Sequence, residues 1–455
     1  MSAATNPSDR LAALDQFKSA IAGIEIVIEP TQLAKLSQDY HHFSPILSPQ
    51  LGDKVGDLVV RPADQAEVLR IAQACVQTRL PLTIRGAGTG NYGQCVPLQG
   101  GVILDMTRLN QIRWLKPGAA RVEAGIKLAT LDRQAQPTGW ELRMLPSTFR
   151  TATLGGFIAG GSGGIGSINY GLLADRGNLH ALRVVTLEET PRVLELRGDE
   201  VQQVNHAWGI NGIITEVELP LAPAYPWAEA VVCFQDFMDA ARFGRALAVA
   251  DGLVKKLICV CAWPIPVYFG PLQGSIPNGS HCALLMVAES SVELLQGLVR
   301  EHNGRLCYQK SAQEASKGLT VAEFSWNHTT LHARSVDPTI TYLQTLFPNQ
   351  PNLDLIEHCY HHFGEEVMMH LEFIRANGSL VPAALQLVRF TNEARLNEII
   401  RYHEEQGAFI ANPHVYIIED GGRKQIDPAQ LRFKQQMDPY GLLNPGKLRA
   451  WEEQH

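Results

Sequence analysis

Apolar residues recur at helical spacing in some segments of the chain and form short continuous or alternating runs in others. Near the N-terminus, Leu11, Leu14, Phe17 and Ile21 share one face of a helix that we expect over Asp9–Gly23. The next segments alternate between the two types of pattern. Apolar and β-branched runs predict strands at Asp57–Pro62, Leu82–Ile84, Gly101–Met106, Ala120–Gly125, Glu141–Met144, His180–Thr186 and Gly212–Leu219, and helical stripes predict helices at residues 65–80 and 127–136.

A proline-rich stretch divides this pattern from a second one. Pro220–Trp227 holds three prolines in eight residues, which indicates a boundary between domains. Beyond it the periodicity predicts helices near residues 237–249, 292–301 and 392–406 and a strand near 283–288. We therefore expect an α+β fold with a lead-in at 1–50, one domain at 51–224, a second at 225–425 and a C-terminal segment at 426–455.

Composition narrows the class of protein. The 455 residues are 45% hydrophobic and 19% charged, with a formal net charge of -7, which argues against a nucleic-acid-binding protein that relies on broad basicity. No apolar run is long enough for a membrane span, and the N-terminal residues lack the apolar centre of a secretory signal. The eight cysteines contain no C-x-x-C pair, and Cys259 and Cys261 are too close for an ordinary zinc or iron–sulfur motif. We expect reduced thiols and a cytoplasmic location.

The stretch RGAGTGNYG (Arg85–Gly93) contains G-x-G-x-x-G after a predicted strand, as a dinucleotide-binding loop does. That motif needs a helix that begins within the loop, because the helix N-terminus binds the pyrophosphate. Here Pro97, Gly100 and Gly101 exclude such a helix, and the chain runs directly into the next strand. The loop is therefore a strand–loop–strand connection whose backbone amides can still surround an anion.

A second stretch, Pro146–Asp175, is also crowded with glycine, serine and threonine. Such a segment cannot pack a core, and its exposed amides favour close contact with an extended polar ligand.

In these segments the sequence resembles the FAD-linked oxidases of the vanillyl-alcohol oxidase and p-cresol methylhydroxylase type, and within them the branch of glycolate and D-lactate dehydrogenases. The matching stretches follow in the family's order and cover about the first half of the chain and about its last twenty residues. They are VVRPADQAEVLRIAQAC, RGAGTG, GGVILDMTRLNQI, ATLGGFIAGGSGG, GINGIITEVEL and MDPYGLLNPGKL. The resemblance implies a two-subdomain FAD-binding domain at 51–224, an α+β substrate (cap) domain at 225–425, and a C-terminal segment at 426–455 that packs back on the FAD domain.

The resemblance also implies which residues bind FAD. For the pyrophosphate these are Gly86, Ala87, Gly88, Thr89, Gly90 and Asn91; for the ribityl and isoalloxazine side, Pro146, Ser147, Thr153, Gly155, Gly156, Ala159 and Gly160; for the adenosine end, Gly212, Ile213 and Ile214. Asn444, in NPGK, would bring the C-terminal segment to the flavin. Several relatives attach FAD through a histidine in the first glycine loop. Arg85–Gly93 contains no histidine, so we expect non-covalent FAD.

The sequence departs from its hydroxy-acid-oxidising relatives at the substrate side. Those relatives share an H-x-G-D-G-N-x-H signature that binds a metal and supplies a base, and this chain has only HHFGEEVMMH (His361–His370). A GEHG-type stretch is replaced by NPHVYIIEDGG (Asn412–Gly422). His358, His361 and His362 share a helix face near Glu365, but we interpret them as a solvated cluster and predict no metal site.

Oxidation of a 2-hydroxy acid needs a base, a cation for the carboxylate and a cavity that excludes water. His370 and Glu372 would share one face of a strand, and His414 and Tyr416 would alternate on another. Our candidates for these tasks are His328, His370, Glu372, Arg375, Arg389, His414 and Tyr416. Arg375 is out of phase with His370, so a bulge or the end of the strand would have to turn it inward.

We predict an FAD-dependent oxidoreductase that acts on CH–OH groups, with a small D-2-hydroxy acid such as glycolate or D-lactate as the first substrate class. The alternatives are an oxidase of a neutral alcohol or polyol and a weakly catalytic flavoprotein subunit of a larger dehydrogenase. The electron acceptor is open, with oxygen, a quinone, a cytochrome and an iron–sulfur subunit as candidates, because the chain has no cluster motif of its own.

Overall fold

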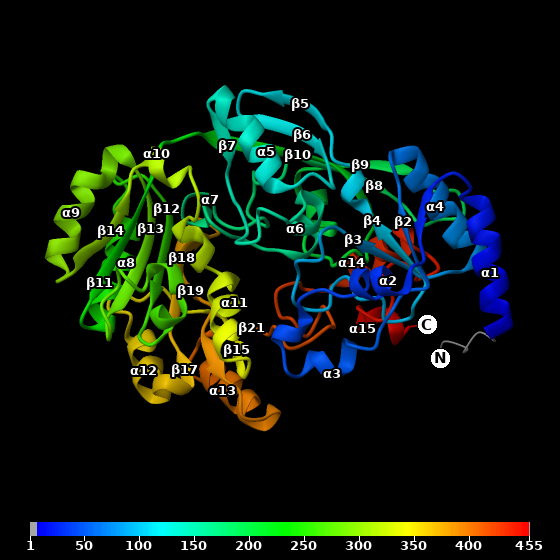
Figure 1. Cartoon of the computed structure of the whole chain (residues 1–455). Coiled ribbons are helices and arrows are strands. Elements are labelled where there is room, and N and C mark those ends of the chain that lie inside the picture. Colours follow the sequence, from blue (N-terminus) through cyan, green and yellow to red (C-terminus); the bar gives the residue numbers. More distant parts are fainter. Residues whose placement is uncertain (1–6, 455) are drawn as a thin grey trace.

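The computed structural model describes residues 7–454, which form four β-sheets with helices around them (Figure 1). Residues 1–6 of the expected lead-in and residue 455 of the expected C-terminal segment lie outside this description. The mixed architecture confirms the expected α+β class. Among residues 7–454, no helix is both long and apolar enough to cross a lipid bilayer.

The N-terminal part is a four-stranded sheet in the order β1-β2-β4-β3, in which β2, β4 and β3 run parallel. Its strands are β1 (Glu25–Val27), β2 (Leu58–Arg61), β3 (Leu82–Arg85) and β4 (Val102–Asp105), and its helices are α1 (Pro7–Ala20), α2 (Pro30–Leu36), α3 (Leu47–Leu51) and α4 (Gln65–Thr78). The Asp64 carboxylate begins α4 by accepting the amide of Glu67 at 2.9 Å. No helix separates β3 from β4, as the sequence predicted for the first glycine loop.

The middle part is a second sheet with the order β5-β6-β10-β8-β9, and β7 also pairs with β10. Its elements are β5 (Ile112–Lys116), β6 (Ala119–Glu123), α5 (Leu128–Ala135), β7 (Trp140–Leu142), α6 (Leu154–Gly160), α7 (Ser167–Tyr170), β8 (Ala181–Val185), β9 (Val193–Arg197) and β10 (Ile213–Pro223). Alternate residues such as Val122 and Leu182 point into the core.

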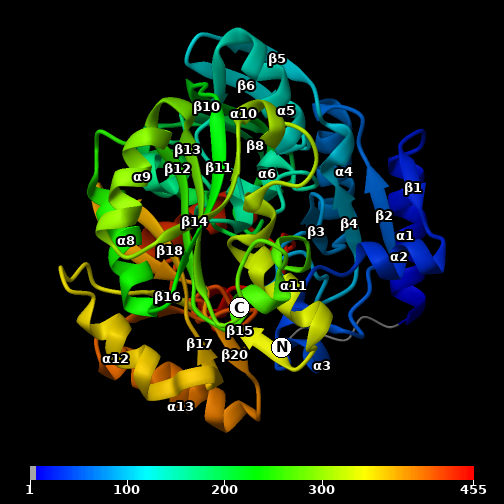
Figure 2. The ribbon, with the colours of Figure 1, turned by 60° about the vertical axis from the view of Figure 1, so that its left-hand side comes forward.

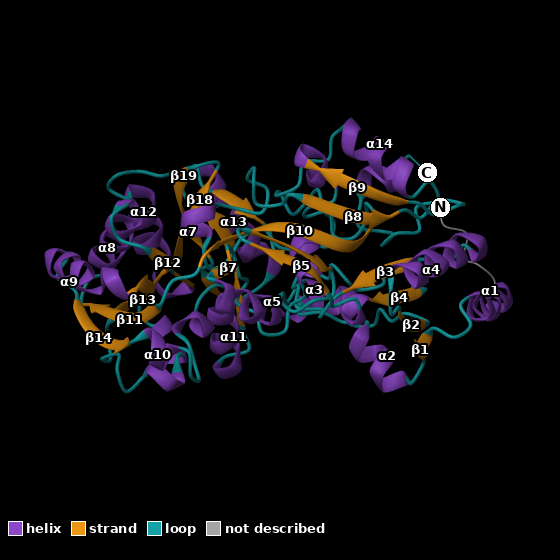
Figure 3. Cartoon of the chain, turned by 90° about the horizontal axis from the view of Figure 1, so that it is seen from above, coloured by secondary structure: helices purple, strands orange, loops and turns teal. Residues whose placement is uncertain are grey.

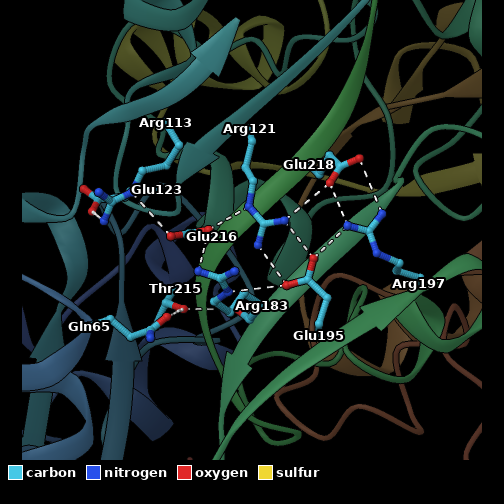
Figure 4. Close-up of polar contacts among 10 residues, drawn as sticks. All are labelled: Gln65, Arg113, Arg121, Glu123, Arg183, Glu195, Arg197, Thr215, Glu216 and Glu218. Carbon is cyan, nitrogen blue, oxygen red and sulfur yellow. Dashed lines mark hydrogen bonds and ion pairs between the residues drawn. The ribbon is translucent and has the colours of Figure 1, made fainter.

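The other face of this sheet carries an ion-pair lattice (Figure 4). Its members are Arg113, Arg121, Arg183, Arg197, Glu123, Glu195, Glu216 and Glu218. Arg121 donates to Glu216 at 2.7 Å and to both oxygens of Glu195 at 2.7 and 2.8 Å. Arg183 reaches the same two carboxylates, so each charge in the lattice has an opposite partner.

The third part is an eight-stranded sheet in the order β14-β11-β13-β12-β18-β19-β16-β21, visible edge-on at the left of Figure 1. Its strands are β11 (Trp227–Phe234), β12 (Lys255–Cys261), β13 (His281–Ala288), β14 (Arg305–Lys310), β16 (Gln344–Leu346), β18 (His370–Ala376), β19 (Ser379–Ala384) and β21 (Phe409–Ala411). One face packs against α8 (Phe237–Val249), α9 (Val292–Glu301), α12 (Asp354–Phe363) and α13 (Glu393–Glu405). Figure 3 shows α8 and α9 on the outer side. The opposite face belongs to the same apolar cluster as the middle sheet, so the two parts share a core.

The remaining elements connect these parts. A three-stranded sheet is formed by β15 (Ile340–Tyr342), β17 (Val367–Met368) and β20 (Leu387–Arg389), and the short helices are α10 (Ala312–Ala315), α11 (Asn327–Val336), α14 (Pro428–Met437) and α15 (Arg449–Glu452). In Figures 1 and 2, α11 lies between the eight-stranded sheet and the N-terminal part. The C-terminal segment returns to the N-terminal sheet, where Leu443 forms a parallel bridge with Leu82.

Two expectations for the chain path need correction. The strand expected at Gly212–Leu219 continues to Pro223, so the sheets are separated at residues 224–226, within the proline-rich stretch. The alternation expected for His414 and Tyr416 is wrong, because β21 ends at Ala411. The side chain of Asn412 accepts the amide of His414 at 2.9 Å and turns the chain instead.

Candidate functional site

The first glycine loop leaves β3 at Arg85, whose guanidinium anchors it from behind. Arg85 donates to the carbonyl of Gln38 at 2.6 Å and lies 3.3 Å from the thiol of Cys95. Gly88 has φ +67°, and a side chain there would collide with the Arg85 guanidinium. The loop therefore requires glycine at this position for both its backbone conformation and its space.

The second glycine stretch lies directly against the first. Thr153 caps α6 by accepting the amide of Gly156 at 3.3 Å, and its hydroxyl fills the space that a side chain at Gly86 would need. Gln94, after the first loop, donates to the carbonyl of Gly160 at 3.0 Å. The two stretches thus form one wall made largely of backbone.

This wall faces a cavity of about 310 Å³ that the eight-stranded part closes from the other side. The wall formed by the two glycine-rich stretches (the glycine wall) contributes residues 86–91 and most of the polar residues between Pro146 and Gly163. From the other side come Trp326, Asn327, His328, Leu331, Gln344, Thr345, Ile374, Ala383, Ala384 and Leu385. The hydroxyl of Tyr92 joins the two sides by donating to Gln344 Oε1 at 2.7 Å.

Buried polar atoms around this cavity have no partner among the described residues. They are Trp208 Nε1, Asn211 Oδ1, Trp326 Nε1, Asn327 Oδ1 and Arg423 Nε. An unpaired buried donor or acceptor costs about 1–3 kcal/mol, so a set of five on one cavity indicates a polar ligand. FAD fits this wall, because its phosphates need backbone amides without bulky side chains and its other polar groups can pair with some of these atoms.

Arg423 is the unusual member of this set. Among the described residues that line the cavity it carries the one guanidinium or ammonium group, and no carboxylate lines the cavity. It forms no ion pair within residues 7–454, and burial lowers its pKa. The residue is only partly buried, but its Nε atom is buried without a partner, which indicates that an anion belongs beside it.

The residues predicted to bind FAD mostly converge on the cavity. Those that line it are Gly86, Ala87, Gly88, Thr89, Gly90, Asn91, Pro146, Ser147, Thr153, Gly155, Gly156, Ala159, Gly160, Gly212 and Ile214. Ile213 instead points into the core of the N-terminal part. Asn444 lies behind the wall, where its amide donates to the carbonyls of Gln94 at 2.7 Å and Trp208 at 2.6 Å.

Of the seven catalytic candidates, His328 is the one that lines the cavity. Its ring is buried, which lowers its pKa, and Nδ1 lies 3.8 Å from Glu323 Oε2. His414 is buried elsewhere, with Nδ1 2.8 Å from Ser44 Oγ and Nε2 2.9 Å from the Tyr342 carbonyl. Tyr416 packs against an apolar cluster formed by residues 47, 51 and 96.

The other candidates also lie outside the cavity. His370 and Glu372 share a face of β18, as expected, but this face is sealed within the shared core. Arg375 follows a regular strand pairing with no bulge and points to a separate surface pocket, where it meets Asp251 at 3.2 Å. Arg389 is half-exposed and pairs with Asp337 at 3.3 Å. These four side chains therefore do not line the cavity beside the glycine wall.

Sequence reasoning missed Arg423, Trp326 and Asn327. Arg423 directly follows the two glycines that end EDGG, so a search for a cation next to a flexible turn could have found it. Trp326 has φ +52°, and its amide donates to Glu372 Oε1 at 2.7 Å, which fixes the start of α11. Sequence gives no signal for that long-range contact.

Comparison with known proteins agrees with this geometry. The family described as FAD binding domain matches residues 56–195. The "Glycolate oxidase subunit GlcD" of Escherichia coli (strain K12) is 30% identical over 207 residues, which are 43% of this chain and 41% of that protein. The chain thus matches about two fifths of that relative's length. The protein of the same name from Bacillus subtilis (strain 168) is 22% identical and covers 87% of this chain and 89% of its own.

Solved structures show the fold. An alkyldihydroxyacetonephosphate synthase superposes with a TM-score of 0.72 at 16% identity and covers 96% of this chain and 85% of its own. At this identity the likeness concerns the fold alone. The chain therefore combines an FAD-binding domain with the fold predicted from its resemblance to the FAD-linked oxidases.

Proposed function

We propose that this chain, which resembles the FAD-linked oxidoreductases in its FAD-binding domain and its fold, oxidises a small 2-hydroxy acid of the glycolate or D-lactate type. The observation that carries the proposal is Arg423, an unpaired guanidinium on a cavity that no carboxylate lines within residues 7–454. A guanidinium offers two parallel donors to a carboxylate, so a hydroxy acid satisfies it better than a neutral alcohol does.

His328 is our candidate for the base. Its imidazole lines the cavity, and burial lowers its pKa, so the ring is neutral at neutral pH and can accept the hydroxyl proton. FAD, when bound, supplies the acceptor for the hydride that leaves the adjacent carbon. Transfer of the hydroxyl proton to His328 and departure of the hydride from the adjacent carbon together convert the hydroxy acid into a 2-oxo acid.

Trp326 and Asn327 would orient the substrate. The indole Nε1 can donate and the Asn327 side chain can accept, and neither has a partner among the described residues. The apolar side chains Ile374 and Leu385 complete this side of the cavity and exclude water. The names of the two GlcD relatives agree with this substrate class. We also propose that the electrons pass to an acceptor outside this chain, for which a quinone and an iron–sulfur subunit are the candidates. We propose a cytoplasmic location as well.

Anaerobic bleaching of the flavin absorbance tests the proposal. We expect glycolate or D-lactate to bleach it, and glycerol and other neutral alcohols to leave it oxidised. Arg423→Lys should weaken the apparent affinity for the acid by about ten- to a hundredfold, or about 1–3 kcal/mol, with FAD content unchanged. Arg375→Lys and Arg389→Lys are the controls, since both arginines lie outside the cavity.

Two results would overturn this assignment. Bleaching by neutral alcohols and not by hydroxy acids would favour the alcohol-oxidase alternative. Loss of FAD from Arg423→Lys would assign the guanidinium to the cofactor's phosphates and remove the main support for an acidic substrate.

A further inference from the structure

A cluster of thiol and imidazole groups lies on the inner face of the eight-stranded sheet. Strand pairing aligns Cys261 of β12 with His370 of β18, and Cys259 with Glu372. Residues 259 and 261 alternate with a residue that points the other way, so both thiols project from the same face. All four side chains are almost completely buried, and none lines the flavin cavity.

The distances within this cluster are those of a metal site. The two sulfur atoms are 3.7 Å apart, Cys259 Sγ is 3.3 Å from His370 Nε2, and the three ligand atoms all lie within 4.8 Å of one another. A tetrahedral zinc ion with Zn–S about 2.3 Å and Zn–N about 2.0–2.1 Å needs separations of about 3.8 Å between sulfurs and about 3.6 Å between sulfur and nitrogen. The two separations that involve Cys259 are within a few tenths of an ångström of these values, and Cys261 and His370, which lie within 4.8 Å of each other, would move together around one ion.

The imidazole is already oriented for coordination. His370 Nδ1 is 3.1 Å from the carbonyl of Leu385, which can only accept, so Nδ1 carries a proton. This contact is the usual outer support of a metal-binding histidine, and it turns Nε2 toward the thiols. Nε2 also lies 3.0 Å from Glu372 Oε1. A proton between these two atoms or a metal ion beside them can hold them together.

We propose that Cys259, Cys261 and His370 bind one Zn²⁺, with the Glu372 carboxylate, which lies 3.0 Å from His370 Nε2, as the fourth donor after a shift of its side chain. Binding releases the two thiol protons, and any proton held between His370 Nε2 and Glu372, to solvent, and the two thiolates and the carboxylate offset the ion's charge. Because the ligands are sealed from the cavity, the site is structural and has no open position for a substrate. It joins β12 to β18 and, through the bond from the Trp326 amide to Glu372, supports the segment that presents Asn327 and His328.

Metal analysis of the purified holoprotein, prepared without chelators from zinc-supplemented medium, tests this site. We expect about one zinc per chain in the native protein. The double variant Cys259→Ser/Cys261→Ser should lose it while retaining FAD. Cys75→Ser is the matched control, because Cys75 is a buried thiol in α4 far from the cluster, and this variant should keep its zinc.

A second measurement covers the case in which the double variant does not fold. Native protein loaded with Co²⁺ should develop a thiolate-to-metal charge-transfer band and the visible bands of tetrahedral cobalt. Native protein that contains no zinc and shows no such bands would overturn the proposal and leave His370 and Glu372 as a buried hydrogen-bonded pair. Zinc retained in the folded double variant would equally overturn it.

Discussion

The ion-pair lattice and the flavin cavity are both rich in polar groups, yet they differ in how these groups are paired. In the lattice on the middle sheet, four arginines and four glutamates satisfy one another (Figure 4). Around the cavity, five buried polar atoms, one of them Nε of the Arg423 guanidinium, have no partner within residues 7–454. Polar groups that all have partners contribute to stability and have no capacity for a ligand. Polar groups that lack partners can be paired by a bound ligand.

The largest effect should come from Gly88→Val. The branched side chain would collide with Arg85 and push ligand phosphates away from the loop, so FAD per chain should fall by about tenfold or more. Gly139→Val is the matched control, since Gly139 also has a positive φ, +84°, but open space around it. Flavin absorbance of the purified variants checks this. Full occupancy in Gly88→Val would mean that the loop does not bind the pyrophosphate.

The next largest effect should be that of His328→Asn. Loss of the proposed base should slow flavin reduction by about 10²–10⁴-fold with FAD retained. The parent should also slow as pH falls below the ordinary histidine range, because protonation removes the base, and the variant should lose this dependence. His332→Asn is the control, because His332 lies on the same helix but bonds to the Glu323 carbonyl, outside the cavity. Equal rapid-reaction rates for both variants would exclude His328 as the base.

A fully paired buried group should affect stability and not the flavin, and His414 tests this. Burial lowers its pKa to about 4, whereas the unfolded chain takes up a proton below about pH 6.5. Stability should therefore fall as pH drops from about 6.5 to 4, by up to about 3 kcal/mol from this group. His414→Gln should be less stable at neutral pH but show a shallower acid slope in denaturant unfolding, and the exposed His361→Gln should match the parent. An unchanged slope in His414→Gln would contradict the assignment.

The smallest effect should be that of Arg121→Gln in the lattice. Removing this guanidinium takes one partner from Glu195, Glu216 and Glu218, but Arg183 and Arg197 still pair with them. We therefore expect a loss of about 1–2 kcal/mol and normal FAD content. Arg176→Gln removes an exposed pair with Asp199 and should cost less than about 0.5 kcal/mol. A loss of FAD from Arg121→Gln would show that the lattice and the cavity are coupled.

Sequence patterns predicted those helices, strands and loops whose conformation depends on residues close together in the chain. The apolar stripe of α4 and the strand–loop–strand path around Gly88 both depend on neighbouring residues, and the structure confirms them. The same is true of the strand that carries His370 and Glu372.

The substrate side was harder to predict, because alternation along a strand shows which residues share a face but not what that face meets. His370 and Glu372 share a face that is buried in a core common to two sheets, and Arg375 faces a different pocket. From the sequence, the spacing of Cys259 and Cys261 was too short for an ordinary metal-binding motif, whose cysteines lie in a turn. On a strand this spacing brings both thiols to one face, and His370 arrives from more than a hundred residues away.

The C-terminal return has a consequence for the order of events during synthesis. Leu443 pairs with Leu82, Asn444 holds the loops at Gln94 and Trp208, and the ammonium of Lys447 donates to the Gly93 carbonyl at 2.6 Å. These contacts support the glycine wall from behind, yet the ribosome makes them after both large sheets. A nascent chain can thus fold its sheets early, but its cofactor pocket gains this support only once residue 447 has left the exit tunnel, so we expect stable flavin binding to follow the synthesis of this segment.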